Sequence, residues 1–261
     1  MVTMSSYILY FSGGWAIQVP FNENQEKYPK AKEINPGWYS AMSQGHALSV
    51  LTRAYRKTNN KKYLESAIKG LQLFKYPLYK DPDKGYEFVD DTNRKQIGVS
   101  SLFLNQFLWF QEYPTEPNTF VLNGFMYSLI GLYDLWHTIK YVYELNDESV
   151  RKEGLEAGDL FLKGMKSLNT MLPMYDIASG SVYDLRHVTM PGVEPKVARW
   201  DYHSVHINLL YLLSTIDIQD VKSDLQHSVK KNIPDSEEES VLANIAERWL
   251  GYMVGKRSGH N

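Results

Sequence analysis

Three long stretches of this sequence are apolar on nearly every face of a helix, and this pattern limits the possible folds more than any other feature. The three stretches are residues 38–57, 119–139 and 203–216. A helix without a polar face has to be surrounded by other elements, so each stretch predicts a buried helix. A more amphipathic helical stretch follows each of them, at residues 61–75, 149–172 and 238–253. We therefore expect three hairpins, each with an inner and an outer helix.

The three hairpins form an internal repeat. Equivalent points, Gln44, Asn123 and His206, recur about 80 residues apart. This spacing favours a mainly α fold, an incomplete (α/α) toroid in which inner helices touch on all sides and outer helices keep one wet face. A chain of 261 residues with 43% hydrophobic residues can bury a core of that size. We expect one domain over residues 1–261.

The segments that join the hairpins are longer than simple turns. Residues 85–104 and 180–189 mix β-branched and aromatic residues with turn formers, which predicts short β segments there. Residues 219–239 are polar and charged, which predicts a mobile surface loop followed by the start of a capped helix. Long loops at one end of a rigid ring are where a functional site is usually built.

Charge and cysteine content exclude several classes of function. A formal net charge of -2 gives no global reason to expect nucleic acid or an anionic membrane as partner, and no nucleic-acid-binding module is found. The absence of cysteine rules out disulfides and thiolate metal sites. The first residues hold only a short apolar run, so we expect neither a signal peptide nor a membrane anchor in this chain.

Motifs of several common enzyme mechanisms are also absent. There is no phosphate-binding glycine loop, no Gly-x-Ser-x-Gly elbow and no His-Glu-x-x-His helix. His203 and His206 have a helical spacing that a metal could use, but no carboxylate pattern completes the ligand set, so no metal is predicted. The 19 tyrosines and 6 tryptophans mostly fill a core, and some could stack on sugar rings in a cleft.

Three short motifs combine titratable and aromatic residues, and the first and third of them directly precede expected inner helices, while the second lies in an expected strand. They are Glu112-Tyr113-Pro114-Thr115, Tyr183-Asp184-Leu185-Arg186-His187 and Arg199-Trp200-Asp201-Tyr202-His203. Pro114 favours an extended residue before it, which presents Glu112 and Tyr113 at a helix entrance. In a strand, Tyr183 and Arg186 share a cavity only where twist or a bulge brings them together. Simpler explanations are an exposed loop glutamate, a surface ion pair in the second motif, and ordinary hydrogen-bonded histidines.

These motifs resemble those of heparan sulfate glucuronyl C5-epimerases, in particular their carboxy-terminal helical domain. Residues 36–42 and 120–135 share the resemblance, which runs from about residue 13 to 255 in the same order. It implies conversion of D-glucuronic acid to L-iduronic acid in N-sulfated heparosan, during heparan sulfate and heparin biosynthesis. Members of that family are Golgi proteins with a membrane anchor and β-rich domains, and they pair as homodimers. We expect this chain to lack the anchor and those domains.

The implied reaction needs a cation beside the sugar carboxylate and proton carriers on both faces of the ring. Arg186 could hold the carboxylate through two parallel hydrogen bonds as enediolate charge develops. Glu112 and Tyr202 are predicted as the acid/base pair, because inversion needs one group on each face. Tyr183 is a close contender, and Tyr113 is a further candidate.

The resemblance also implies which residues bind the polysaccharide around the reacting sugar. These residues are Asn123, Tyr127, Arg199, Trp200 and His203. Removal and return of a proton needs no redox cofactor, so no cofactor is expected. The expected partner is an N-sulfated heparosan or heparan sulfate chain in the Golgi lumen.

Two other functions remain open at this point. A polysaccharide lyase or glycoside hydrolase could use the same fold, and a lyase shares the proton abstraction before it expels the 4-linked sugar. A catalytically silent polysaccharide-binding module is the second alternative. Entry of deuterium at carbon 5 without cleavage would distinguish an epimerase from both.

Overall fold

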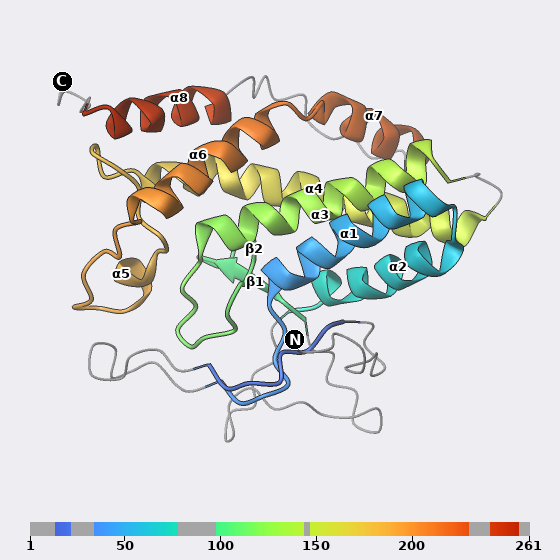
Figure 1. Cartoon of the computed structure of the whole chain (residues 1–261), viewed down its shortest axis with the longest axis horizontal. Coiled ribbons are helices and arrows are strands. Elements are labelled where there is room, and N and C mark those ends of the chain that lie inside the picture. The colour runs from blue at the N-terminus through green and yellow to red at the C-terminus, as the bar shows by residue number, and fades with distance from the viewer. Residues whose placement is uncertain (1–13, 22–33, 78–97, 144–146, 230–240, 256–261) are drawn as a thin grey trace.

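Helices form most of the chain in the computed structural model, which describes residues 14–21, 34–77, 98–143, 147–229 and 241–255 (Figure 1). The longer helices are α1 (Ala41–Thr58), α2 (Lys61–Lys75), α3 (Leu122–Tyr141), α4 (Glu148–Met171), α6 (Trp200–Ser214), α7 (Ile218–Val229) and α8 (Val241–Met253). Two short helices, η1 (Leu172–Tyr175) and α5 (Arg186–Thr189), lie between α4 and α6. The mainly helical fold is confirmed. Among the described residues, no helix combines the length and apolarity needed to cross a membrane.

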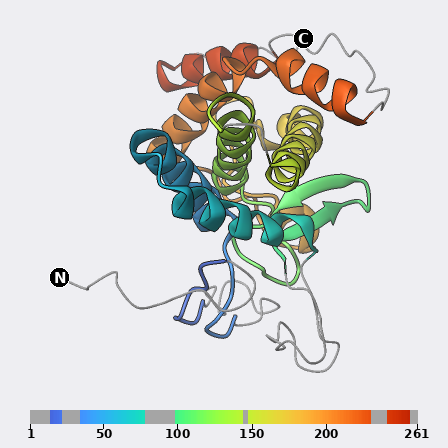
Figure 2. The ribbon, with the colours of Figure 1, turned by 90° about the vertical axis from the view of Figure 1, so that its right-hand side faces the viewer.

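The central helix is α3, which contacts both α1 and α6 (Figure 2). Its apolar side chains point in every direction, and Phe125, Met126 and Leu135, which lie on different sides of the helix, are all fully buried. Each inner helix packs against an outer one: α1 against α2, α3 against α4, and α6 against α8. The chain thus forms the inner–outer helix pairs that the two kinds of apolar pattern predicted.

The backbones of α1 and α3 touch where the two helices cross. A Cβ atom on Gly131 would lie 2.3 Å from the carbonyl oxygen of Gly45, and one on Gly45 would lie 2.7 Å from the Cα atom of Ser128. Both distances are shorter than any normal contact, so these two positions require glycine. The close approach holds the first two inner helices in a fixed register.

A two-stranded antiparallel sheet leads into the first motif. Strand β1 (Ser100–Phe103) pairs with β2 (Phe107–Phe110), and Ser100 lies opposite Phe110. The extended segment predicted over residues 85–104 is present at its end, while residues 85–97 lie outside the described part of the chain. Strand β2 was not predicted, because its four consecutive apolar residues show no alternation. Directly after β2, the backbone of Gln111 bonds to Val99 and Ala41, which fixes the position of the next residue.

The extended segment predicted over residues 180–189 ends early. Val182 forms a bridge with Val197, but Arg186–Thr189 is a single helical turn. The carboxylate of Asp184 accepts a hydrogen bond from the backbone N–H of Arg186 at 3.2 Å, which turns the chain out of the extended conformation. The short β segment predicted here is therefore wrong beyond Val182.

The prediction of a mobile loop over residues 219–239 is wrong for the first half of that range. Helix α7 occupies that part of the sequence and packs against α4. Val221 and Leu225 lie one turn apart and are buried, so α7 has an apolar side that the charged composition concealed. Residues 230–240 lie outside the described part of the chain.

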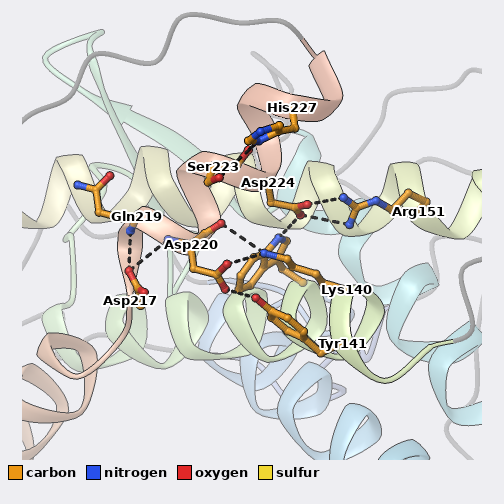
Figure 3. A network of polar contacts seen from close by, with 10 residues as sticks. Lys140, Tyr141, Arg151, Asp217, Gln219, Asp220, Ser223, Asp224 and His227 are labelled. Carbon is orange, nitrogen blue, oxygen red and sulfur yellow. Dashed lines mark hydrogen bonds and ion pairs between the residues drawn. The ribbon is translucent and has the colours of Figure 1, made fainter.

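Polar contacts fasten α7 to α3 and α4 (Figure 3). The carboxylate of Asp224 accepts hydrogen bonds from the indole N–H of Trp136 at 2.9 Å and from the guanidinium of Arg151 at 3.2 Å. Lys140 donates to the carboxylate of Asp220 at 2.6 Å. These contacts hold α7 against α3 and α4, although α7 has few apolar residues.

Replacement of Asp224 by alanine is expected to destabilise the fold. The Asp224 side chain is 7% exposed, and its loss removes the acceptor of the indole N–H of Trp136 and one ion pair of Arg151. We expect a loss of about 2 to 4 kcal/mol in the free energy of unfolding, measured by urea denaturation. The matched control is Asp159→Ala, which removes a surface pair with Lys163 and should cost about 0.5 kcal/mol or less. Equal losses in the two variants would show that the α7 contacts are not stabilising.

Candidate active site

Glu112 lies after β2 and packs against the first turn of α3. Its side chain is almost completely buried, with 2% of the residue exposed. A Cβ atom on Gly124 would lie 2.2 Å from the Oε2 atom of Glu112 and 2.7 Å from its Cβ atom. Only glycine allows this approach, so the carboxyl group rests on the backbone of the helix. Among the described residues, Oε2 has no hydrogen-bond partner.

Burial raises the pKa of Glu112 to about 6. Hydrogen bonds from Tyr113 and Tyr183 and the positive charge of Lys196 act in the opposite direction and lower it. The nearby carboxylate of Asp184 raises it further. A carboxyl group with this pKa is close to the range in which it can both accept and return a proton at neutral pH.

Two tyrosines contact this carboxyl group, and a third packs against one of them. The hydroxyl of Tyr183 donates to the Oε1 atom of Glu112 at 3.5 Å, and Tyr113 is also hydrogen-bonded to Glu112. The rings of Tyr183 and Tyr202 meet edge to face, with their centroids 4.9 Å apart. The structure therefore brings together the four residues that were predicted from the sequence as proton carriers.

The four residues differ in their access to solvent. Tyr202 is 37% exposed and Tyr183 only 7% exposed, while Glu112 is the most buried of them. Burial and the charge of Glu112 raise the pKa of both Tyr113 and Tyr183 above the usual value of a phenol. Both phenols therefore keep their protons at neutral pH. Within the cluster, Glu112 is suited to accept a proton, and Tyr202 is placed where a ligand can touch it.

Rings from the amino-terminal side hold Tyr113 in place. The ring of Phe21 stacks on Tyr113 with centroids 4.2 Å apart, and Trp38 lies 5.9 Å from the same ring. The backbone N–H of Ile17 donates to the carbonyl oxygen of Trp38, and that of Gly37 donates to Ile17, which fixes this segment. Sequence reasoning missed Phe21 as a support of the site, because nothing in the local pattern links it to Tyr113.

Arg186 lies in the interior rather than at an open surface. Its side chain is 2% exposed, and its Nε atom donates to the carboxylate of Asp184 at 2.8 Å. Asp184 is fully buried, so the simpler explanation of a surface ion pair is wrong. A buried guanidinium needs a partner of opposite charge, and Asp184 supplies it. The predicted role of Arg186 as the holder of a sugar carboxylate therefore gains no support from this geometry.

His203 is also an interior residue, with 5% of its surface exposed. Its Nε2 atom lies 3.0 Å from the carbonyl oxygen of Trp249, so Nε2 carries the proton. Its Nδ1 atom then accepts from the hydroxyl of Ser181 at 2.8 Å, and Ser181 in turn accepts from His206 at 2.9 Å. Burial lowers the pKa of His206 to about 3, which keeps it neutral. The polysaccharide contact predicted for His203 is not favoured, because its ring atoms already have interior partners.

The remaining predicted contacts lie on α3 and at the start of α6. Asn123 is 5% exposed and precedes Gly124, and among the described atoms its side-chain oxygen lacks a hydrogen-bond partner. Tyr127 is one turn further along α3 and half-buried. Trp200 is 74% exposed at the start of α6, beside Arg199, which bonds to Asp201 at 2.9 Å. No cluster of three or more metal-binding side chains occurs in the described ranges.

Comparison of the sequence with known proteins identifies a family that covers most of the chain. The family described as the D-glucuronyl C5-epimerase C-terminus matches residues 12–231, which include all four residues of the cluster. The chain is 42% identical over 249 residues to D-glucuronyl C5-epimerase from Caenorhabditis elegans, a match that covers 95% of this chain and 33% of that protein. It is 30% identical over 151 residues to an uncharacterized protein from Methanocaldococcus jannaschii, covering 58% of this chain and 41% of that protein. The chain thus spans less than half the length of either relative.

Proposed function

Because the chain belongs to the D-glucuronyl C5-epimerase C-terminal family, we propose that its cluster of Glu112 and tyrosines inverts carbon 5 of D-glucuronic acid in N-sulfated heparosan. The product is L-iduronic acid, and the reaction belongs to heparan sulfate and heparin biosynthesis in the Golgi lumen, carried out by a homodimer. The strongest support is a buried carboxyl group with a pKa of about 6 that contacts phenols leading to the surface. The matched relative is about three times as long, so activity of this chain alone is part of the proposal.

The proposed reaction begins with the proton on carbon 5, which lies next to the sugar carboxylate. Glu112 is buried, so it acts through the hydroxyl of Tyr183, which is 3.5 Å from its Oε1 atom. Tyr183 takes the carbon 5 proton while its own phenol proton moves to Glu112. The electron pair of the broken C–H bond moves into the carboxylate and forms an enediolate.

The second half of the reaction returns a proton to the opposite face. The more exposed phenol of Tyr202 donates its proton to carbon 5, and the enediolate electron pair forms the new C–H bond. Water then reprotonates Tyr202, and Glu112 releases its proton, so nothing is consumed. The rings of Tyr183 and Tyr202 touch, so the sugar has to bind at their hydroxyl ends rather than between the rings.

The test is incubation of the chain with N-sulfated heparosan in heavy water, followed by NMR of the uronate carbon 5. We expect deuterium at carbon 5 without shortening of the polymer. Tyr202→Phe should slow this exchange by about 100-fold or more, because the phenylalanine has no proton to give. Tyr211→Phe, at the other end of α6, is the matched control and should exchange like the unmodified chain.

Two results would overturn the proposal in different ways. An unsaturated uronate product, detected by its ultraviolet absorbance, would show a lyase that expels the 4-linked sugar after the same proton abstraction. Binding of the polymer with no exchange would show a polysaccharide-binding module. If Tyr202→Phe exchanges at the rate of the unmodified chain, the proposed reaction stands but Tyr202 takes no part in it.

A further inference from the structure

Pairs of side chains meet along the contact between the inner helices α1 and α3. The Nδ2 atom of Asn123 lies 3.8 Å from the Sδ atom of Met42. One turn further along both helices, the rings of His46 and Tyr127 meet, with their centroids 4.3 Å apart. The partners in both pairs are 81 positions apart, so the two helices run in the same direction with a constant register. No sequence motif singled out His46.

This row of side chains begins at the proposed proton carriers. The backbone N–H of Leu122, the first residue of α3, donates to the carbonyl oxygen of Tyr183 at 3.1 Å. Gly124 lies directly under the carboxyl group of Glu112. Asn123 is therefore between two contacts with the proton carriers, and among the described residues its buried Oδ1 atom has no hydrogen-bond partner. The two rings that meet one turn further on lie about 6 Å along the helix axis from this position.

His46 is open to solvent, and Tyr127 is half-buried. The amino-terminal segment packs on the opposite side of α1, where the side chain of Gln44 accepts from the backbone N–H of Trp15 at 3.0 Å and donates to its carbonyl oxygen at 2.9 Å. Partial burial lowers the pKa of His46, so its ring is neutral at neutral pH and offers one N–H donor and one acceptor nitrogen. Neither ring nitrogen is hydrogen-bonded to a described residue, so both can bind a ligand.

We propose that His46 and Tyr127 bind the amino sugar next to the reacting uronate, with the ring N–H of His46 donating to the sulfate on the nitrogen of that sugar. The inference rests on the proposed function, since it names a further part of the polymer that the same site binds. Heparosan alternates uronate and glucosamine, so the sugar beside the reacting uronate is always an amino sugar. The ring of Tyr127 can pack on the apolar face of that sugar.

The sulfate gives the contact its specificity. A hydrogen bond to an ionised oxygen is stronger than one between neutral groups, and an N-acetyl group at the same place offers only a neutral oxygen. The amino sugar keeps its charge and structure throughout the reaction, so the contact is equally strong in the bound polymer and in the transition state. Such a contact lowers KM and leaves kcat unchanged. His46 is thus a substrate-binding residue and takes no part in proton transfer.

The decisive variants are His46→Phe, which keeps a ring beside Tyr127 without an N–H, and His46→Gln, which keeps an N–H donor. With N-sulfated heparosan we expect KM for carbon 5 exchange to rise by about 10-fold or more in His46→Phe at nearly unchanged kcat, and by less than about 3-fold in His46→Gln. With N-acetylated heparosan, KM should change by less than about 3-fold in His46→Phe. His227→Phe, at an exposed position of α7, is the matched control and should change KM for neither polymer.

A binding experiment separates failure of this inference from failure of the proposed function. The probes are N-sulfated heparosan and N-acetylated heparosan of the same length, and their affinities are measured directly by calorimetry. The unmodified chain should bind the N-sulfated polymer more tightly, and the ratio of the two affinities should fall by about 10-fold in His46→Phe and remain nearly unchanged in His46→Gln. If this result is obtained without any carbon 5 exchange, the inference stands and the proposed reaction fails.

Three outcomes would overturn the inference. They are an unmodified chain that does not distinguish the two polymers, a ratio of affinities that is unchanged in His46→Phe, and equal rises in KM for both polymers in that variant. His46 is exposed, so we expect each variant to unfold at the temperature of the unmodified chain. The ratio of the two affinities does not depend on the fraction of folded chain, so it tests the contact even in a variant of lower stability.

Discussion

Glu112→Gln is expected to abolish carbon 5 exchange and at the same time to stabilise the fold at neutral pH. The amide cannot accept a proton, so we expect the exchange rate to fall by about 100- to 10,000-fold. In the unmodified chain, kcat/KM should rise with pH through a midpoint near the pKa of Glu112, about 6, because only the ionised carboxyl accepts the proton. Exchange measured across this pH range, with and without the substitution, tests both statements.

The stability gain follows from the direction of the pKa shift. The pKa of Glu112 is about 6 in the folded chain, against an ordinary value of 4.5. Between these values the folded state binds more protons than the unfolded state, so stability falls as the pH rises through this window. Ionisation of the buried group costs about 2 kcal/mol above the window and nothing below it. A glutamine does not ionise and avoids this cost.

Urea denaturation at two pH values therefore distinguishes the cost of ionising Glu112 from a loss of stability that does not depend on pH. Glu112→Gln should be more stable than the unmodified chain by up to about 2 kcal/mol above pH 6, and the difference should disappear below the ordinary pKa of a glutamate. Glu65→Gln, at an exposed position of α2, is the matched control and should leave exchange and stability unchanged. Equal destabilisation of Glu112→Gln at both pH values would refute this account of the buried carboxyl group.

Gly124→Ala should have the second large effect, because it displaces Glu112 without changing any titratable group. The new methyl group would lie 2.2 Å from Oε2 and 2.7 Å from the Cβ atom of Glu112, so the base of the side chain has to move along with its tip. A displacement of about 1 Å can lower a rate by about 100-fold, and we expect a loss of that size in carbon 5 exchange. The free energy of unfolding should fall by about 1 to 2 kcal/mol, since crowding outweighs the better helix propensity of alanine.

The chain offers a close control for this substitution. Gly180 has no atom within 4 Å of the position that a Cβ atom would take, and it precedes the segment that carries Tyr183. Gly180→Ala should therefore keep both exchange and stability close to those of the unmodified chain. If Gly124→Ala also keeps full exchange, the exact position of the Glu112 carboxyl group does not limit the reaction.

The helices could be predicted from the sequence because the spacing of apolar residues within each segment indicates a helix. The prediction of residues 61–75 coincides with α2, and the buried stretch at 119–139 overlaps α3 with small shifts at both ends. Periodic apolar residues reveal a buried face wherever its partner comes from. Helix α7 was missed because its apolar contacts are few and its other anchors, such as Asp224 on Trp136, join residues 88 positions apart.

The sequence could also predict that the proposed proton carriers lie close together. It could not predict which individual polar residues are buried. Glu112 and Tyr202 lie at the mouths of two different inner helices, so the expected architecture already placed them at one end of the fold. His203 became an interior residue because it bonds to Trp249, which is 46 positions away. No pattern of neighbours in a sequence reports such a partner.

The hydroxyl of Ser181 joins two histidines of α6 to the segment that leads to Tyr183. Ser181 lies two positions before Tyr183, and His203 directly follows Tyr202. The distance between the two phenols is therefore governed by a small set of buried hydrogen bonds, and not by the exposed side of Tyr202. A ligand that binds on that side can then vary along its length without altering the spacing of the two hydroxyl groups.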